Sequence, residues 1–438
     1  MTHSQMHEDA VELLLASISK DRGTGFKHSF EFGPPGAQPW QKGLVIEIYY
    51  RPNKLIRAVL RVRQSGPAYL RLISIKEVQR MLQKFVLQNF GYLMDDVFLR
   101  KFEGSFADQV SQAAKSRFAD ALASSSIFQP DSELTLFPLA TVQVQTDFDS
   151  QVFFLAAPSS LDAAKLPPGV GVQSIVPELF PPVSDWQGRH ERPTAWLGVW
   201  SPAYQASNKM KAAILGALAL TPLKPYRHMF SGRQVFGGHC TFGRRTTTWG
   251  FGAAHTPPLM HNIIVTSSDH AWLTILSSKL TSGKKSVRRQ IRALEYFYRA
   301  WELDPSERFP ILCMSLDALF GAQKGMTTAA AIAGIQSLLG NIRLERLESL
   351  FRLRGNVIHG HAPDVYDSSE YSLYYDSYQV DPIDDLELLV GSCLRAQIFG
   401  SALGEHSDPN AEMIATAQAK GHLPQDLSSG TILDDVLP

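Results

Sequence analysis

The sequence predicts an α+β fold class: an N-terminal α+β domain of unassigned type followed by a C-terminal, all-α helical bundle. Three observations predict this division. Before residue 265, runs rich in Val, Ile, Tyr and Phe alternate with segments of helical periodicity. From Asp269 onward, apolar residues recur at helical spacing with few interruptions. The connections between these later segments are short, which favours antiparallel neighbouring helices.

The expected domains are therefore residues 1–265, which form one α+β domain or two, and residues 268–405, which form the bundle. Residues 406–438 are rich in Pro, Gly, Ser and Asp. We expect this C-terminal tail to fray, because it carries little apolar periodicity.

Composition and charge limit the class of protein. A content of 44% hydrophobic and 19% charged residues is typical of a globular chain. The formal net charge is zero, so nucleic acid would need a local basic patch. The 3 Cys are scattered, which predicts reduced thiols in a cytoplasmic protein. No basic signal sequence and no apolar run of about 20 residues is present, so we expect no membrane association.

The elements of the first 265 residues follow from local patterns. We expect a helix within residues 1–21 and a loop at Gly33–Gly36. Two β-rich runs around a polar break predict a hairpin of strands 44–50 and 55–62. Apolar residues three and four positions apart predict helices, and β-rich runs predict strands. These are helices 75–99, 106–122 and 206–220, strands 134–144, 152–157 and 196–200, and a hairpin within 236–251; prolines between 167 and 182 predict a long connection.

The helical half is predicted element by element. Asp269 can cap a helix that reaches about Lys279, and Pro305 suits the first turn of another. The expected helices are 269–279, 284–303, 305–320, 327–339, 342–358 and 385–403. An acidic, Tyr-rich segment, residues 364–387, precedes and enters the last of these.

One stretch carries candidate chemistry. The amphipathic segment that begins near Ile342 ends in Arg354, Asn356 and His359, and Gly360 then predicts a helix end. An arginine offers a permanent, forked charge that suits phosphate, and a histidine exchanges a proton near neutral pH. Together these side chains form a minimal set for cutting RNA without a metal.

Arg354-x4-His359 and its neighbourhood resemble the HEPN family, in particular its ApeA-like branch. The resemblance covers residues 268–405 and includes the upstream segments 293–304, 305–309 and 315–321. It implies a HEPN bundle that works as a homodimer through residues 341–361, needs no cofactor and cleaves RNA. It also implies a role in antiviral defence or toxin action, with a phage-derived trigger or an antitoxin as partner. Asp317 stands where the resemblance implies Glu, so its reach to Arg354 needs a structural test.

In this interpretation His359 takes the proton of a ribose 2′-hydroxyl, Arg354 holds the phosphate oxygens, and Asn356 orients the phosphate or the arginine. The products would be a 2′,3′-cyclic phosphate and a 5′-hydroxyl. The alternative is a non-catalytic module for dimerisation or RNA binding, or half of a toxin–antitoxin pair. Arg354 would then be a surface ion-pair residue, and His359 would interact with the helix dipole. His361 is either a second general acid or a loop residue.

Two further clusters of residues, one basic and one of His and Cys, are candidate binding sites. A basic face predicted to contact RNA phosphates consists of Lys285, Arg288, Arg289 and Arg292. The alternative is a solvated face paired with the acidic segment 364–387, which could also cover the RNA site and inhibit it. His and Cys gather in residues 228–261, but without the spacing of a zinc site. We therefore predict no metal site, and the absence of a GxxxxGK loop argues against a P-loop ATPase.

Overall fold

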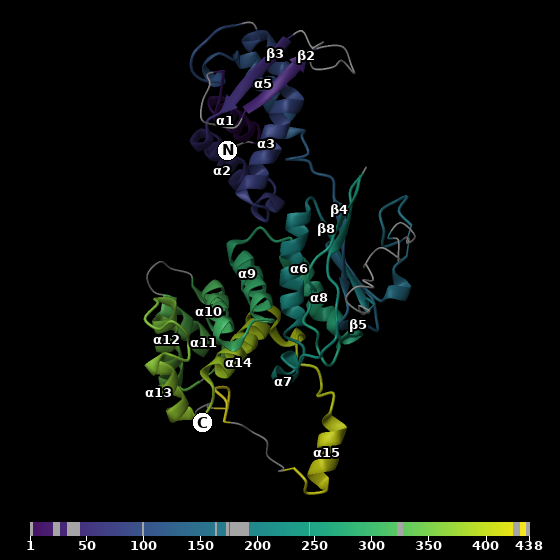
Figure 1. Ribbon diagram of the computed structural model, residues 1–438, viewed down its shortest axis with the longest axis vertical. Helices are drawn as coiled ribbons and strands as arrows, with labels where there is room; N and C mark the ends of the chain where they lie inside the picture. Colours follow the sequence, from purple (N-terminus) through teal and green to yellow (C-terminus); the bar gives the residue numbers. More distant parts are fainter. Residues whose placement is uncertain are drawn as a thin grey trace. The chain divides into compact units, whose positions relative to one another are not determined.

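The computed structural model describes the chain apart from residues 1–2, 21–26, 33–43, 99, 163, 172–174, 176–191, 245, 322–326, 341, 424–429 and 435–438. The predicted loop at Gly33–Gly36 and part of the proline-rich connection lie outside the described residues. The fold class is confirmed as α+β: sheets and helices come first, and the described residues from about 267 to 420 are all helical (Figure 1).

The chain separates into two compact units. Unit 1 contains Met1–Ser132 with Pro202–Ala206, and unit 2 contains Glu133–Ser201 with Ser207–Pro438. The strands after residue 132 therefore belong to the same compact unit as the helices after residue 267.

Unit 1 packs helices beside a small antiparallel sheet with the strand order β1-β3-β2. Its main elements are α1 (His3–Ala16), β1 (Ile18–Ser19), β2 (Lys27–Phe32), β3 (Leu44–Tyr50), α2 (Pro52–Ser65), α3 (Ile75–Asn89), α4 (Met94–Val97) and α5 (Gln112–Ala123). One apolar core joins them, with Leu14, Ile48, Val59, Leu82 and Phe118 all fully buried. The predicted first helix and the helices after residue 75 are confirmed.

The predicted hairpin at residues 44–62 is wrong in its second half. Residues 55–62 belong to helix α2 rather than to a strand. Pro52 occupies the first turn, where its fixed backbone suits a helix start. The buried residues Leu55, Ala58, Val59 and Val62 follow helical spacing, so the β-rich composition of this run misled the prediction.

Unit 2 begins with a six-stranded antiparallel sheet of order β10-β9-β4-β8-β7-β6. Its strands are β4 (Glu133–Leu139), β6 (Phe148–Asp149), β7 (Phe153–Ala156), β8 (Ala195–Ser201), β9 (His239–Phe242) and β10 (Thr247–Gly250). A separate parallel pair joins β5 (Val142–Val144) to β11 (Ile263–Val265). The central strands β4 and β8 are buried at almost every residue, so both faces of the sheet centre are covered. The predicted hairpin within 236–251 is confirmed as β9 and β10.

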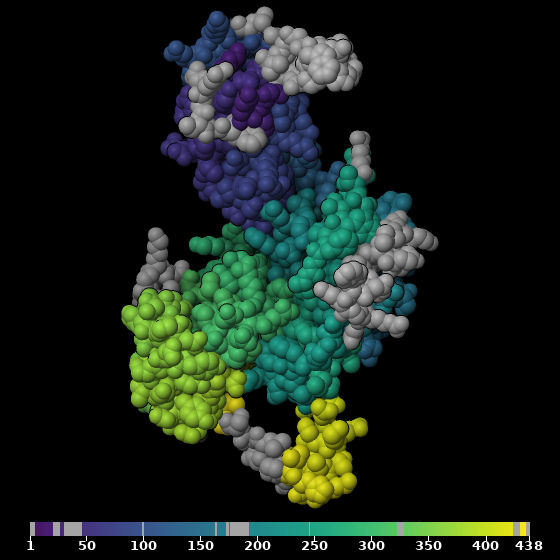
Figure 2. All heavy atoms as spheres, viewed as in Figure 1, coloured from purple at the N-terminus to yellow at the C-terminus, as the bar shows by residue number. Residues whose placement is uncertain are grey.

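The helices from residue 204 onward are α6 (Tyr204–Leu218), α7 (Lys224–Arg227), α8 (His270–Leu280), α9 (Lys285–Ala300), α10 (Pro305–Phe320), α11 (Thr327–Leu339), α12 (Leu344–Ile358), α13 (Ser369–Tyr378), α14 (Pro382–Leu394) and α15 (Ala411–Ala419). Seven of them correspond to predicted helices, although the predicted helix 385–403 is found as α14 and ends at Leu394. Helices α7, α13 and α15 are not among the predicted ones. Asp269 takes part in a capping box with Thr266 ahead of α8. Helices α12 and α13, light green, form part of the surface seen in Figure 2.

The prediction that the tail frays is wrong for the residues around Ile432. Residues 411–419 form the helix α15, in which no residue is buried. Farther along, Ile432 is fully buried, and its backbone N–H donates to the buried carboxylate of Asp385 (2.9 Å). Arg346 donates to the carbonyl of Gly430 (3.0 Å) and to Asp385 (3.0 Å). Since unpaired buried charges are costly, these bonds hold the tail against α12 and α14.

Two expectations from the sequence, on membrane-spanning helices and on the cysteines, can be compared with the described residues. Among the helices that the structure describes, none has the length and apolar character required to cross a bilayer. Cys240, Cys313 and Cys393 are free and buried, and burial raises the pKa of the Cys240 thiol to about 12. Such thiols stay protonated near neutral pH.

Candidate functional site

The predicted motif lies at the C-terminal end of helix α12. The amphipathic pattern buries Leu347, Leu350 and Leu353. The helix ends at Ile358, so that His359 is the residue after it, and Gly360 has a φ of 72°. A positive φ favours glycine, and the predicted helix stop at Gly360 is confirmed.

Arg354 is held by an acid from a neighbouring helix. Its guanidinium lies 2.5 Å from the carboxylate of Asp317 on α10, so the shorter acid does reach it. A second, longer contact of 3.5 Å goes to the hydroxyl of Thr328 on α11. The Arg354 side chain is only 13% exposed. The ion pair therefore fixes the arginine, and the weakly bound nitrogen on the Thr328 side is the donor that a phosphate could take over most easily.

His359 and His361 are exposed, and their ring centroids are 6.2 Å apart. Two imidazoles therefore stand near each other, at the end of the helix that carries Arg354. Asn356 donates to the hydroxyl of Ser368 at 3.4 Å, which ties it to the start of α13. The structure thus places Asn356 beside another element, whereas the two histidines face solvent.

Arg354 and His359 do not lie on one side of α12. An α-helix turns about 100° per residue, so five positions separate the two side chains by about 140°. The buried flank of the helix carries Arg354, which contacts α10 and α11. One chain therefore presents the arginine and the histidine in different directions.

The predicted basic face on α9 splits into two pairs. Lys285 and Arg288 are exposed. Arg289 instead donates to the carbonyls of Ala318 (3.1 Å) and Leu319 (3.3 Å) at the end of α10.

Arg292 is 40% exposed, but it lies 2.6 Å from Glu295 and over the ring of Tyr296. Of the four residues of the predicted basic face, only Lys285 and Arg288 make no described side-chain hydrogen bond or ion pair.

The acidic, Tyr-rich segment makes its described polar contacts with α7, α10 and α12, and none of those contacts involves α9. Glu370 lies 3.4 Å from Arg352, and Asp385 binds Arg346. Tyr366 and Tyr371 pack edge to face at 5.0 Å. The described residues therefore show no contact that supports the hypothesis that this segment neutralises the basic face of α9.

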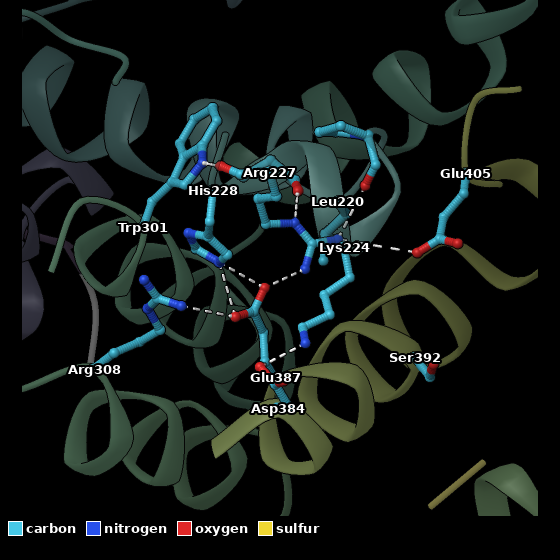
Figure 3. A network of polar contacts seen from close by, with 12 residues as sticks. Leu220, Lys224, Arg227, His228, Trp301, Arg308, Asp384, Glu387, Ser392 and Glu405 are labelled. Atoms are coloured by element: carbon cyan, nitrogen blue, oxygen red, sulfur yellow. Dashed lines mark hydrogen bonds and ion pairs between the residues drawn. The ribbon is translucent and has the colours of Figure 1, made fainter. Parts of the chain in front are cut away.

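Sequence reasoning missed a buried charge network, shown in Figure 3. The carboxylate of Glu387 on α14 lies 2.6 Å from Arg227 at the end of α7, 2.8 Å from His228 and 3.2 Å from Arg308 on α10. The indole of Trp301 donates to the backbone carbonyl of Arg227 (3.0 Å). No spacing in the sequence could reveal this network, because α7 and α14 are about 160 residues apart.

The network keeps Glu387 charged. Burial acts to raise the pKa of Glu387, but the hydrogen bond from His228 and the charges of Arg227 and Arg308 outweigh it and lower the pKa to about 2. The carboxylate of Glu387 thereby links α7, α10 and α14 through buried ion pairs.

A second buried pair involves one of the histidines that the sequence singled out. Lys211 on α6 lies 3.0 Å from Nδ1 of His255, and Tyr298 donates to the His255 carbonyl (2.8 Å). Burial lowers the pKa of Lys211 to about 8 and that of His255 to about 3. The amine is thus partly neutral near physiological pH, but it is buried above the ring of Phe137.

The His and Cys residues of 228–261 have separate positions. His228 binds Glu387, His261 packs on Tyr226 and Cys240 lies in the sheet core. His239 and His255 are the exception, because both rings pack on Phe137; His255 also binds Lys211. Within the described residues, no group of three or more His, Cys, Asp or Glu could hold a metal ion. Comparisons of the chain with family models, curated proteins and solved structures found no match.

Proposed function

We propose that residues 268–405 act as a HEPN-type, metal-independent endoribonuclease that works as a homodimer. The observation that carries this proposal is the pairing of Arg354 with Asp317 at 2.5 Å, five residues before an exposed His359. An arginine fixed before substrate binding loses less freedom when it stabilises charge. An exposed imidazole is free to exchange protons with a bound ribose.

In the proposed reaction His359 accepts the proton of the ribose 2′-hydroxyl. The 2′-oxygen then attacks phosphorus, and the bond from phosphorus to the 5′-oxygen breaks. Arg354 stabilises the negative charge on the non-bridging oxygens. The leaving 5′-oxygen takes a proton from a second imidazole, that of His361 or of His359 in the other copy. The products are a 2′,3′-cyclic phosphate and a 5′-hydroxyl, and DNA lacks the attacking group.

The dimer matters because Arg354 and His359 of one chain point about 140° apart around the helix. A second copy across α12 would supply the histidine that one chain cannot direct toward its own arginine. Leu344 and Ile358 support such a contact, because they are 44% and 41% exposed. Fourteen positions are nearly four helical turns, so both lie toward the same side of α12.

The test measures cleavage of end-labelled RNA in EDTA by the full chain and by two variants. His359→Ala should lose roughly 10²- to 10⁴-fold in rate while still binding RNA. Arg354→Lys keeps a charge but not the fork, and should lose most activity. Arg352→Lys is the matched control, because Arg352 lies on the same helix but is exposed and bound to Glu370; its rate should stay near that of the unchanged chain.

Several results would remove this mechanism: a requirement for Mg²⁺, products with 5′-phosphates, or a full rate in His359→Ala. Retained RNA binding without cleavage would favour the alternative, a non-catalytic dimerisation or RNA-binding module or a toxin–antitoxin component. In the proposed setting, antiviral defence or toxin action, residues 1–265 would sense a phage-derived trigger, bind an antitoxin or restrain the nuclease. Cleavage should then be measured with and without an extract from phage-infected cells.

A further inference from the structure

Unit 2 contains a cavity of about 520 Å³ that is separate from α12. It lies between α7, the segment from His261 to Ser268, and the chain after residue 404. This volume is within the range of about 300–1,000 Å³ that small-molecule sites occupy. The cavity therefore has room for a ligand of nucleoside size.

One wall of the cavity is a histidine that a buried acid orients. Nε2 of His406 lies 3.0 Å from Asp269, which also accepts from the indole of Trp272 (2.9 Å) and the backbone of Thr266 (2.9 Å). Burial acts to raise the pKa of Asp269, but these hydrogen bonds outweigh it and lower the pKa. A charged Asp269 makes Nε2 the protonated nitrogen, so that Nδ1 of the neutral ring is an acceptor.

A second wall is aromatic. The rings of Tyr226 and His261 meet edge to face, with centroids 5.6 Å apart and planes at 86°. The Tyr226 hydroxyl donates to Asp408 (2.5 Å) and accepts from Asn410 (3.3 Å), so the phenol ring is fixed at its far end. The fixed ring of Tyr226, the ring of His261 and an aliphatic neighbour, Ile264, suit a flat heterocycle.

The charges around the cavity argue against an anionic ligand. No Lys or Arg is among the described residues that line it. Glu405 lines the cavity and lies 2.8 Å from Arg395. Its carboxylate and Nδ1 of His406 are acceptors, so a complementary ligand has N–H donors. The hydroxyls of Thr266 and Ser268 can in addition bind ribose hydroxyls.

We propose that this cavity binds an uncharged nucleoside, with the base against Tyr226 and His261 and its amino or ring N–H groups toward Glu405 and His406. The site is distinct from the proposed RNA-cleavage site and does not depend on it. A nucleoside 5′-phosphate would bring two negative charges near Glu405 and Asp408 without a cation from the lining, and should bind less well.

The test is isothermal titration calorimetry of the full chain with adenosine, guanosine, cytidine and uridine, and with their 5′-monophosphates. At least one nucleoside should bind with a Kd below about 1 mM, and its monophosphate should bind at least about tenfold more weakly. Ile264→Trp should abolish binding, because the indole would fill the cavity. Met229→Trp is the matched control: Met229 is similarly exposed (37% against 39%) but does not line the cavity.

His261→Ala is a second variant, which removes one ring without adding bulk and should weaken binding at least about tenfold. His359→Ala should bind the nucleoside unchanged, which separates this site from the proposed cleavage site. Absence of binding by all four nucleosides, equal or tighter binding of the monophosphates, or unchanged binding in both folded cavity variants would overturn the proposal.

Discussion

Glu387→Gln is expected to destabilise unit 2 by about 3 kcal/mol at neutral pH. The carboxylate is only 2% exposed, so solvent screens it little. Its pKa is held at about 2, against an ordinary value of 4.5. This difference of about 2.5 corresponds to about 3 kcal/mol, because each pKa unit is worth about 1.4 kcal/mol. Removing one partner of a buried ion pair typically costs about 3–5 kcal/mol, which agrees.

The pH dependence has a definite sign. The folded state lowers the pKa of Glu387, so its charge stabilises the fold fully above the unfolded pKa of about 4.5. That contribution declines as the pH falls from about 4.5 toward 2 and is lost below the folded pKa. The stability difference between the unchanged chain and Glu387→Gln should therefore be constant from pH 7 to 5 and shrink below about pH 4.5.

Hydrogen exchange followed by mass spectrometry is a suitable assay, because it reports unit 2 separately from unit 1. Protection of α14 peptides should fall by roughly 10²-fold in Glu387→Gln if they exchange through unfolding of unit 2. Glu405→Gln is the control: its carboxylate is 28% exposed and pairs closely with Arg395, so about 1 kcal/mol or less is expected. Equal losses in the two variants, or no loss in Glu387→Gln, would refute the reasoning.

The remaining predictions concern single side chains. Ile432→Ala should lower the stability of unit 2 by about 2–4 kcal/mol, because the side chain is fully buried; hydrogen exchange in α14 checks this. Arg289→Ala should weaken the α9–α10 contact and lower thermal stability, because it binds two carbonyls of α10. Arg288→Ala should leave stability unchanged but flatten the salt dependence of RNA binding measured by filter retention. Ile358→Asp should convert a dimer to a monomer in light scattering; an unchanged mass would exclude α12 as the interface.

The helical half could be predicted well because its signals are local. Capping at Asp269, proline at residue 305 and glycine at residue 360 mark helix boundaries through backbone chemistry alone. Residues 55–62 show the limit of composition, because β-rich residues with helical spacing formed a helix next to Pro52. In that segment periodicity was the better guide.

The candidate site was predictable in its residues but not in its geometry. The sequence identified Arg354 and His359, and the acid at 317 as a possible partner of the arginine. It could not show that Asp317 reaches Arg354, since that depends on the distance between two helices. Glu387 gave no signal, because its partners come from distant parts of the chain and an isolated buried acid is typical of no motif.

The docked tail also affects how unit 2 can fold. Gly430 and Ile432 bond to residues 84 and 47 positions earlier, so the tail closes onto α12 and α14 through long-range contacts. Lengthening such a loop costs little free energy, about 0.6 kcal/mol per doubling, but long-range contacts slow folding. The reverse step, release of the tail alone, would let water reach the charges of Arg346 and Asp385 while the helices remain formed. We therefore expect local opening of unit 2 to begin where the tail contacts α12 and α14.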